Sequence, residues 1–381
     1  MTMLDLPDRP DLFNFTRDVI GRWAELRPDA PAMLWVDADG RPVERSFSDI
    51  AAAAGRAAAV LSHAGVRRGD TVLILLNREQ QWWELMLGCI AIGAVASPGT
   101  TQLMAKDIAY RHQAAEARCV AATGDMADRV DKALGDADIV RLHIGGPRAG
   151  WLDFDALRDA AQPLLPLADT RFDEDALCYF TSGTTGQPKM TIHTHGYMLA
   201  HRITGSYWLD LGPGDLHWNL SDTGWAKAAW SSLFAPWLMG ATIFAFDPAA
   251  TMDLLERMPV TTLCAPPTAY RMFVRGDIAG RTFPSLRHCV SAGEPLNPEV
   301  IDLWKAATGL DIHDGYGQTE TVLLCANRPG AARQGSMGRP APAFDLAVID
   351  GEGQRMPAGE EGDVALRIAE TLPPGLFARY R

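Results

Sequence analysis

Apolar runs and helix-like segments alternate along the first part of the chain. Residues 47–66 (FSDIAAAAGRAAAVLSHAGV) form an alanine-rich helical pattern, with Ser48 as the expected N-cap and Gly65 as the stop. Residues 71–76 (TVLILL) are a continuous apolar run that is typical of a buried strand. The same reading predicts further helices at 80–89 and 106–115 and strands at 94–96 and 119–122. Such alternation predicts a parallel or mixed sheet covered by helices.

A second half follows a connecting stretch that is richer in Pro, Gly, Asp and Arg, residues 145–173. Beyond it, the pattern predicts strands around Trp218 and at 242–246, 262–265 and 288–291. Past Gly335, short alternating strands and turn-rich spacers indicate antiparallel structure or a small barrel. We therefore expect an α/β fold with two helix-covered mixed sheets and a small β-barrel-like part, divided as 1–168, 169–334 and 335–381.

Composition narrows the class of protein. The 381 residues include 47% hydrophobic and 22% charged residues, which are ordinary globular values and enough for two or three substructures. The 35 basic and 47 acidic side chains give a net charge of −12, so nucleic acid is a poor candidate partner. Six cysteines without a CxxC pair indicate buried thiols in a reducing compartment. No signal peptide or transmembrane run is visible, so we predict a soluble, cytoplasmic protein.

One polar loop organises the candidate chemistry. Residues 181–189 (TSGTTGQPK) lie between two apolar, strand-like runs. Gly183 and Gly186 remove Cβ atoms, which lets backbone N–H groups surround an anion, and Lys189 adds a positive charge. Further donors come from the hydroxyls of Thr181, Ser182, Thr184 and Thr185. The loop suits a polyphosphate, although it lacks the Walker pattern; a flexible polar hairpin is the ordinary alternative.

The nine-residue string resembles the phosphate-binding loop of the adenylate-forming enzymes, the superfamily of acyl-CoA synthetases, luciferases and peptide-synthetase adenylation domains. The resemblance implies a layered αβαβα core, ATP and Mg²⁺ as cofactors, and CoA as a co-substrate. It also implies catalytic roles for Thr184 and Lys189. The likeness runs from about residue 13 to 381 and stops before the small C-terminal domain of the family. We therefore expect this chain to be the large N-terminal domain, with impaired activity on its own.

Three further segments support the resemblance. Residues 221–227 (SDTGWAK) resemble the DTGW segment of acyl-CoA synthetases of the medium-chain and acetyl type. There the tryptophan forms a wall of the acyl pocket, which implies that role for Trp225; core packing is the ordinary alternative. The segment SAGEPL precedes a helix expected at 297–308. The resemblance places adenine against Gly293, Glu294 and Pro295, with Ala292 beside the acyl group; a helix-capping turn is the alternative.

The last segment, DGYGQTE, follows a strand-like run at 310–313 and resembles the YGQTE motif of the superfamily. Tyr316 offers a stacking surface to a purine, Asp314 an acceptor for its amino group, and Glu320 a hard carboxylate for Mg²⁺. By resemblance, Thr319 meets the phosphate region and is catalytic, as is Glu320, and Thr184 shares the metal. The remaining expected nucleotide contacts are Gly315, Gly317 and Gln318.

Two positions bear on the substrates. Acetyl-specific relatives carry a tryptophan where this chain has Gly317, so we expect space for a medium-chain, branched or aryl acid. Each buried methylene would contribute about 0.8 kcal/mol. The segment PGTTQL resembles one in the medium-chain group and makes Gln102 a candidate CoA contact.

His193 and His195 share a strand face, but no acidic or cysteine partner is near them in sequence, so structural packing is favoured over metal binding.

The resulting hypothesis is an acyl-CoA synthetase that forms an acyl-adenylate and then an acyl-CoA. The expected partners are the carboxylic acid, ATP and CoA, without nucleic acid, and a homodimer is compatible with the sequence. One alternative is a ligase that feeds a carrier protein. The other is a non-catalytic nucleotide or acyl binding module.

Overall fold

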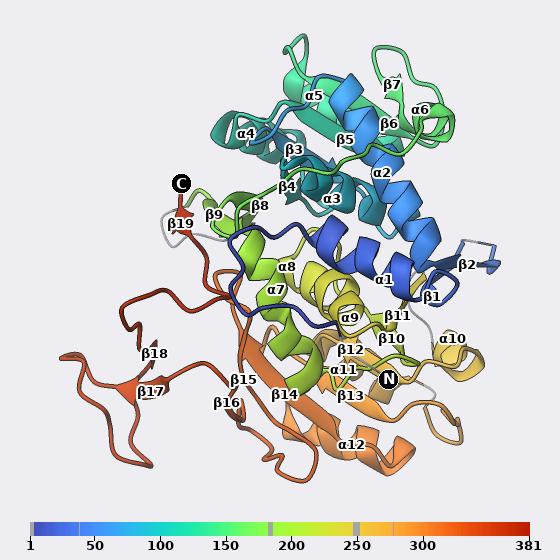
Figure 1. Ribbon diagram of the computed structural model, residues 1–381. Helices are drawn as coiled ribbons and strands as arrows, with labels where there is room; N and C mark the ends of the chain where they lie inside the picture. Colours follow the sequence, from blue (N-terminus) through green and yellow to red (C-terminus); the bar gives the residue numbers. More distant parts are fainter. Residues whose placement is uncertain (1–3, 38, 182–185, 247–251, 277) are drawn as a thin grey trace.

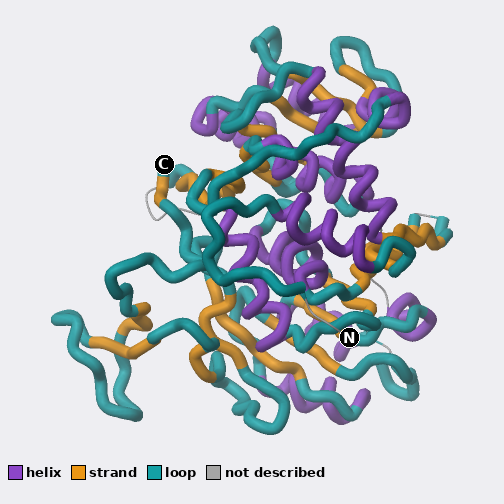
Figure 2. The backbone as a smooth tube through the Cα atoms, in the orientation of Figure 1, coloured by secondary structure: helices purple, strands orange, loops and turns teal. Residues whose placement is uncertain are grey.

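Two large sheets, separated and flanked by helices, form the body of the protein in a computed structural model (Figure 1). The structure describes all residues except 1–3, 38, 182–185, 247–251 and 277. The layers run helix, sheet, helix, sheet, helix, as Figure 2 shows for the helices gathered between the two groups of strands. The predicted αβαβα core is therefore confirmed.

The first sheet has the strand order β19-β9-β8-β4-β3-β5-β6-β7. Strands β8, β4, β3, β5, β6 and β7 are paired in parallel, whereas β9 and β19 add an antiparallel edge. The bounds are β3 (Thr71–Leu75), β4 (Val95–Pro98), β5 (Cys119–Thr123), β6 (Val140–Ile144), β7 (Leu152–Asp153), β8 (Asp175–Thr181), β9 (Lys189–Thr194) and β19 (Arg379–Tyr380).

The second sheet has the order β16-β15-β14-β13-β12-β10-β11-β1-β2. Its centre is parallel and both edges are antiparallel. The bounds are β1 (Pro31–Val36), β2 (Pro42–Ser46), β10 (Leu216–Asn219), β11 (Thr242–Phe246), β12 (Thr262–Ala265), β13 (His288–Ser291), β14 (Ile312–Gly317), β15 (Leu323–Ala326) and β16 (Arg339–Pro340).

Helices fill three layers, each with its own apolar contacts. The central layer holds η1 (Thr16–Gly21), α1 (Arg22–Leu26), α2 (Phe47–His63), α3 (Gln80–Ile92), α7 (His195–Ile203), η2 (Thr204–Trp208), α8 (Ala226–Ala229), η3 (Trp230–Phe234) and α9 (Ala235–Leu238), the η segments being π-helical. The outer layers hold α4 (Ala105–Ala115) and α5 (Gly124–Leu134) on the first sheet, and α10 (Met252–Arg257), α11 (Pro267–Arg275) and α12 (Pro298–Thr308) on the second; α6 (Phe154–Ala160) follows β7. Among the described residues, no helix is long and apolar enough to cross a bilayer.

The N-cap of α2 differs from the expected residue. Ser46, not Ser48, caps the helix: its hydroxyl accepts from the Asp49 backbone N–H, and the Asp49 carboxylate accepts from the Ser46 backbone N–H. This reciprocal capping box places the N-cap two residues earlier than predicted, whereas the helix begins at Phe47, the first residue of the predicted range. The stop is as expected, because Gly65 follows the helix with a φ of +94°.

Past Gly335 the predicted antiparallel structure is present as a two-stranded sheet of β17 (Leu346–Ile349) and β18 (Asp363–Leu366). It projects from the body in Figure 1. The strands on either side of it join the large sheets instead, β16 the second and β19 the first. The last strand thereby reaches the edge of the phosphate-loop hairpin.

The sheets exchange segments across the expected boundary at residue 168. Strands β1 and β2 belong to the second sheet, although they precede that boundary, and β8 and β9 belong to the first sheet, although they follow it. The division of the chain into subdomains 1–168, 169–334 and 335–381 stays a prediction. In the folded protein the two sheets are interleaved.

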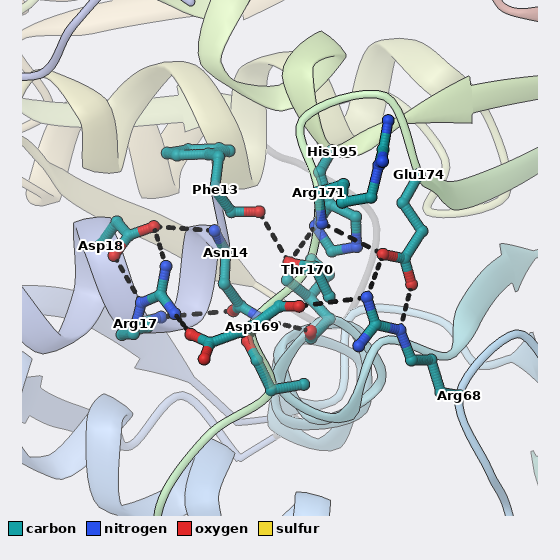
Figure 3. A network of polar contacts seen from close by, with 12 residues as sticks. Phe13, Asn14, Arg17, Asp18, Arg68, Asp169, Thr170, Arg171, Glu174 and His195 are labelled. Carbon is teal, nitrogen blue, oxygen red and sulfur yellow. Dashed lines mark hydrogen bonds and ion pairs between the residues drawn. The ribbon is translucent and has the colours of Figure 1, made fainter. Parts of the chain in front are cut away.

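A polar network fixes the entry into β8 (Figure 3). Arg68 forms an ion pair with Glu174, and Arg17 pairs with Asp18 and Asp169. The hydroxyl of Thr170 donates to the Phe13 carbonyl at 2.7 Å. These contacts hold the amino end of β8, so the phosphate loop at its carboxyl end extends from an anchored strand.

Candidate active site

The predicted motifs come together where strands of both sheets end at their carboxyl edges. The hydroxyl of Thr223, just after β10, donates to the carbonyl of Leu76, just after β3, at 2.6 Å. A Cβ on Gly224 would lie 2.0 Å from the backbone nitrogen of Thr100, which follows β4. The loops of the two sheets are therefore in direct contact, which is where open α/β sheets collect ligands.

The two arms on either side of the phosphate loop form an antiparallel hairpin, which agrees with the apolar, strand-like runs expected there. Strands β8 and β9 pair antiparallel up to Thr181 opposite Lys189, and Gly186 has a φ of +101°. Lys189 is exposed, as an anion-binding side chain must be. Four predicted contacts, Ser182, Gly183, Thr184 and Thr185, lie outside the described residues.

Tyr380 brings the loop lysine and the proposed metal carboxylate into one region. Its hydroxyl donates to Oε1 of Glu320 at 2.8 Å, and the Lys189 ammonium lies 5.2 Å from its ring centroid. The backbone supports this link, because Phe377 N–H donates to the Glu320 carbonyl and Ala378 N–H to the Ile192 carbonyl. Residues 377–380 thus join β9 to the end of the DGYGQTE motif.

The donor set at Glu320 fits Mg²⁺. Within the described chain, no group of three or more His, Cys, Asp or Glu side chains is placed to hold a metal ion. Mg²⁺ is commonly held by one or two carboxylates together with substrate phosphates and water. A single, partly exposed carboxylate beside a phosphate loop meets that need, so the residues present fit this ion.

The DGYGQTE motif lies largely on a strand, because β14 continues through Gly317. Gly315 is required there, since a Cβ would lie 2.7 Å from the indole of Trp208. Burial raises the pKa of the Asp314 carboxyl to about 6, with Lys227 and backbone N–H groups opposing the shift. Tyr316 and Thr319 are partly exposed and Gln318 is exposed, so the motif offers polar groups to a ligand.

The segment expected to hold adenine is tied to the DTGW segment. The Lys227 ammonium donates to the Ala292 carbonyl at 2.6 Å, and burial lowers the pKa of this amine. The next residues are exposed: Gly293 has a φ of +111° and Glu294 forms an ion pair with Arg271 at 2.9 Å. Pro295 is exposed too. A surface ion pair of this kind contributes little stability, so Glu294 and its neighbours are available to a ligand.

Trp225 and Gln102 both lie at the surface, on loops that meet. Trp225 is 55% exposed, which excludes the alternative of plain core packing. Gln102 is exposed on the loop after β4, where its backbone N–H donates to the Thr100 hydroxyl at 3.3 Å. An exposed indole beside a glycine contact suits a ligand wall.

The chain matches the model of the AMP-binding enzyme family over residues 20–374. It belongs to this family. Acyl-coenzyme A synthetase ACSM3, mitochondrial, of Mus musculus is 43% identical over 97% of this chain and 67% of its own length. The Homo sapiens protein of the same name is 41% identical over 97% of this chain and 66% of its own length. The chain thus spans about two thirds of these relatives.

Solved structures agree with the assignment to the AMP-binding enzymes. An anthranilate CoA ligase in complex with anthranoyl-AMP superposes with a TM-score of 0.89 at 30% identity, covering 100% of this chain and 73% of that one. An acyl-CoA synthetase of Brucella canis gives 0.89 at 28% identity, covering 99% and 70%. The predicted AMP-forming acyl-CoA synthetase, which activates a carboxylate with ATP and uses CoA, is therefore confirmed at the level of the enzyme class.

In this AMP-binding enzyme, neighbouring residues occupy the position that a Cβ atom on Gly317 would take. A Cβ there would lie 2.6 Å from the Val322 carbonyl oxygen and 2.8 Å from the indole of Trp230. A side chain at position 317 would therefore meet Trp230, whose N–H donates to the Tyr197 hydroxyl at 2.6 Å, while space for a longer acid elsewhere beside Gly317 stays a prediction. Trp230 was not identified from the sequence as a neighbour of Gly317, because a tryptophan in an apolar stretch is usually a core residue.

The paired histidines have a structural role. His193 is fully buried, its ring centroid lies 3.8 Å from that of Tyr197, and burial lowers its pKa to about 3. His195 is also buried and begins α7, with a pKa lowered to about 4, mainly by burial. Both side chains are neutral at pH 7 and pack in the central layer. This agrees with the packing alternative favoured from the sequence.

Proposed function

We propose that this protein activates a medium-chain, branched or aryl carboxylic acid with ATP and passes the acyl group to CoA. The observation that carries the proposal is Tyr380, which joins the loop lysine to a carboxylate suited to Mg²⁺. The aryl option is supported by similarity to structures named as anthranilate and benzoate CoA ligases, the latter from Burkholderia xenovorans LB400 at 26% identity, with a TM-score of 0.86 over 97% of this chain and 73% of that one.

Each group of residues has a defined task in the proposal. The loop and Lys189 bind the phosphates, and Thr319 orients the reacting oxygens. The purine lies between the segment ending at Pro295 and the strand that carries Tyr316. The loop contacts are Thr181, Ser182, Gly183, Thr184, Thr185 and Gly186; the remaining purine and ribose-side contacts are Gly293, Glu294, Asp314, Gly315, Gly317 and Gln318.

The acyl group and CoA use the loops that meet at Gly224. Trp225, Ala292 and Gly317 face the acyl group, and Gln102 contacts CoA. Mg²⁺ held by Glu320, with a share from Thr184, would reduce the negative charge on the phosphoryl oxygens. Lys189 adds a fixed positive charge beside them, which reduces the repulsion between the carboxylate and the phosphates.

Two displacements make up the reaction. In the first, a carboxylate oxygen attacks the α-phosphorus of ATP, the bond to pyrophosphate breaks, and an acyl-adenylate forms. In the second, the CoA sulfur attacks the acyl carbon, loses its proton and displaces AMP. Positioning and charge neutralisation, rather than covalent catalysis, are what the described side chains supply.

A carboxylic-acid panel tests the proposal. ATP–pyrophosphate exchange is measured with the small C-terminal domain expected from the family supplied to the chain, using acids from acetate to dodecanoate, branched acids and benzoates, followed by CoA thioester formation. Lys189→Gln should reduce exchange, whereas Lys305→Gln on α12 should not, because Lys305 pairs with Asp311 on the outer layer. A ligase that feeds a carrier protein would exchange without using CoA. A binding module would bind an acyl-sulfamoyl adenosine without exchange, and either result would overturn the proposal.

Two properties of the whole protein are proposed with it. Six free, buried cysteines support a reducing compartment, and we propose the cytoplasm, although the named relatives are mitochondrial. We also propose a homodimer, which light scattering coupled to gel filtration would test. A mass equal to one chain at micromolar concentration would exclude it.

A further inference from the structure

Arg111 on α4 is a half-buried cation that has no ion-pair partner among the described residues. Its guanidinium carbon lies 4.5 Å from the ring centroid of Phe180, and burial lowers its pKa. Within the described chain it makes no hydrogen bond or ion pair. The nearest acid on its own helix, Asp107, is engaged in accepting the Met104 backbone N–H at 3.0 Å. Removing a charged group from water without a partner of opposite charge costs free energy, and a bound anion would offset that cost.

Three loops converge around the side chain of Arg111. Phe180 is next to the last residue of β8, directly before the phosphate loop. The neighbouring Tyr110 donates its hydroxyl to the Pro188 carbonyl on the other arm of that loop at 2.8 Å. On the opposite side, a Cβ on Gly99 would lie 3.9 Å from Nη1 of Arg111.

The third loop is the DTGW segment, whose Gly224 packs against Gly99 and Thr100. A Cβ on Gly224 would lie 2.3 Å from the Gly99 carbonyl carbon. Arg111 therefore reaches the junction of the phosphate loop, the loop after β4 and the proposed acyl wall. Since a guanidinium presents five N–H donors, one phosphate could occupy several of them.

We propose that Arg111 binds a phosphate group at this junction, either of the nucleotide tail or of the CoA diphosphate. The inference rests on the proposed function for the identity of these ligands. Aromatic contact with Phe180 holds the side chain in place without neutralising its charge, so the guanidinium stays available for an anion. Binding there supplements Lys189, which lies on the other arm of the hairpin.

Calorimetric titration of matched variants tests the proposal. Arg111→Gln should weaken the binding of inorganic pyrophosphate and Mg·ATP, or of CoA, about tenfold, which corresponds to about 1.4 kcal/mol. Arg111→Lys should recover part of the loss, because it keeps the charge. Arg118→Gln removes the same charge from an exposed side chain past the far end of α4 and should change nothing. Pantetheine, which has no phosphate, should bind equally to all four proteins.

The outcomes separate the ligands and the two proposals. Loss confined to pyrophosphate and ATP assigns the nucleotide tail, and loss confined to CoA assigns the CoA diphosphate. A stable Arg111→Gln protein that binds all three probes like the parent overturns the proposal, even if the parent exchanges pyrophosphate. Conversely, weakened binding together with no exchange for any acid, even when the small C-terminal domain is supplied, supports Arg111 and overturns the proposed function.

Thermal unfolding distinguishes binding from a structural role. Removing a buried charge that lacks a partner should leave the Tm of Arg111→Gln unchanged or raise it. A loss of binding with a lower Tm in the absence of ligand would mean that Arg111 supports the fold instead, and would overturn the proposal.

Discussion

Glu320 places a partly exposed carboxylate beside Tyr380, and the ring of Tyr380 also lies against the ammonium of Lys189. Replacing Glu320 with Gln keeps the size and the acceptor oxygen but removes the charge that would attract Mg²⁺. We expect Mg·ATP binding to weaken at least tenfold, or about 1.4 kcal/mol. Titration calorimetry checks this, with the exposed Glu299→Gln on α12 as the control. Equal affinities for both variants would contradict a metal role.

Tyr380 acts on the same carboxylate through its hydroxyl. Tyr380→Phe removes the donor and keeps the ring over Lys189, so only the orientation of Glu320 should be lost. Since a hydrogen bond to a charged group contributes about 1.5–3 kcal/mol when shielded and less when exposed, we expect a threefold to tenfold higher Mg²⁺ requirement. The Mg²⁺ dependence of ATP binding measures it. An unchanged requirement would reduce Tyr380 to a packing residue.

Trp230 should limit the length of the acid, because its indole lies beside Gly317. Trp230→Leu should shift the preferred straight-chain acid upward by two or more carbons, each added methylene contributing about 0.8 kcal/mol. The kcat/KM series over chain length measures the shift. Trp218→Leu, which empties the outer core of the second sheet instead, controls for general destabilisation. A series parallel to that of the parent protein would exclude Trp230 from the pocket.

Candidate site residues could be selected from the sequence where the local context favours few other roles. Lys189, Asp314 and Glu320 stood out because glycine-rich or polar context isolates them from any core. Tyr380 and Trp230 did not, because an aromatic residue in mixed sequence reads equally as packing. Their roles depend on which partners the fold brings near them, and those partners are far away in sequence.

At the scale of elements, the contact between the DTGW loop and the loop after β4 depends on the absence of a side chain. Gly224→Ala would place a Cβ 2.0 Å from the Thr100 nitrogen. We expect a destabilisation of about 1–3 kcal/mol by overpacking, with weaker binding of an acyl-sulfamoyl adenosine. Urea unfolding and calorimetry measure the two effects. Gly212→Ala is the control: a Cβ there meets nothing within 4 Å, so neither the stability nor the binding should change.

Strands were predicted well where apolar runs are short and bounded. The predicted strands at 262–265 and 288–291 coincide with β12 and β13. The ends of helices and strands that depend on contacts with other residues were predicted less well. Ser46 and Ser48 are both acceptable caps, and only the reciprocal bond with Asp49 selects Ser46. Likewise β14 runs on through Gly317 because residues 315–317 pair with β15, a partner that the local sequence does not reveal.

At the scale of the whole molecule, the order of the strands in the two sheets could not be predicted from the sequence. Alternation predicted two covered sheets, but β8 and β9 cross to the first sheet and β1 and β2 to the second. Pairing partners are set by burial in three dimensions, and continuous apolar runs fit several positions in a parallel sheet. Interleaving also explains why the loops of both sheets meet at one site.

The interior carries neutral histidines, which makes the stability of the whole protein dependent on pH. Burial lowers the pKa of His193 and His217 to about 3 and that of His195 and His313 to about 4. Each would titrate near 6.5 in the unfolded chain. Between these values the unfolded chain binds more protons, so the free energy of unfolding must fall as pH drops below about 6.5.

Each such histidine lowers the free energy of unfolding by about 1.4 kcal/mol per pH unit well inside that window. Four of them should therefore make the protein several kcal/mol less stable at pH 5.5 than at pH 7.5, a large part of the about 5–15 kcal/mol typical of folded proteins. Urea unfolding at both pH values measures the difference. His217 bonds the hydroxyls of Thr262 and Ser231, and Gln can replace those bonds without binding a proton. His217→Gln should reduce the pH slope by about one proton; an unchanged slope would show that His217 does not titrate on unfolding.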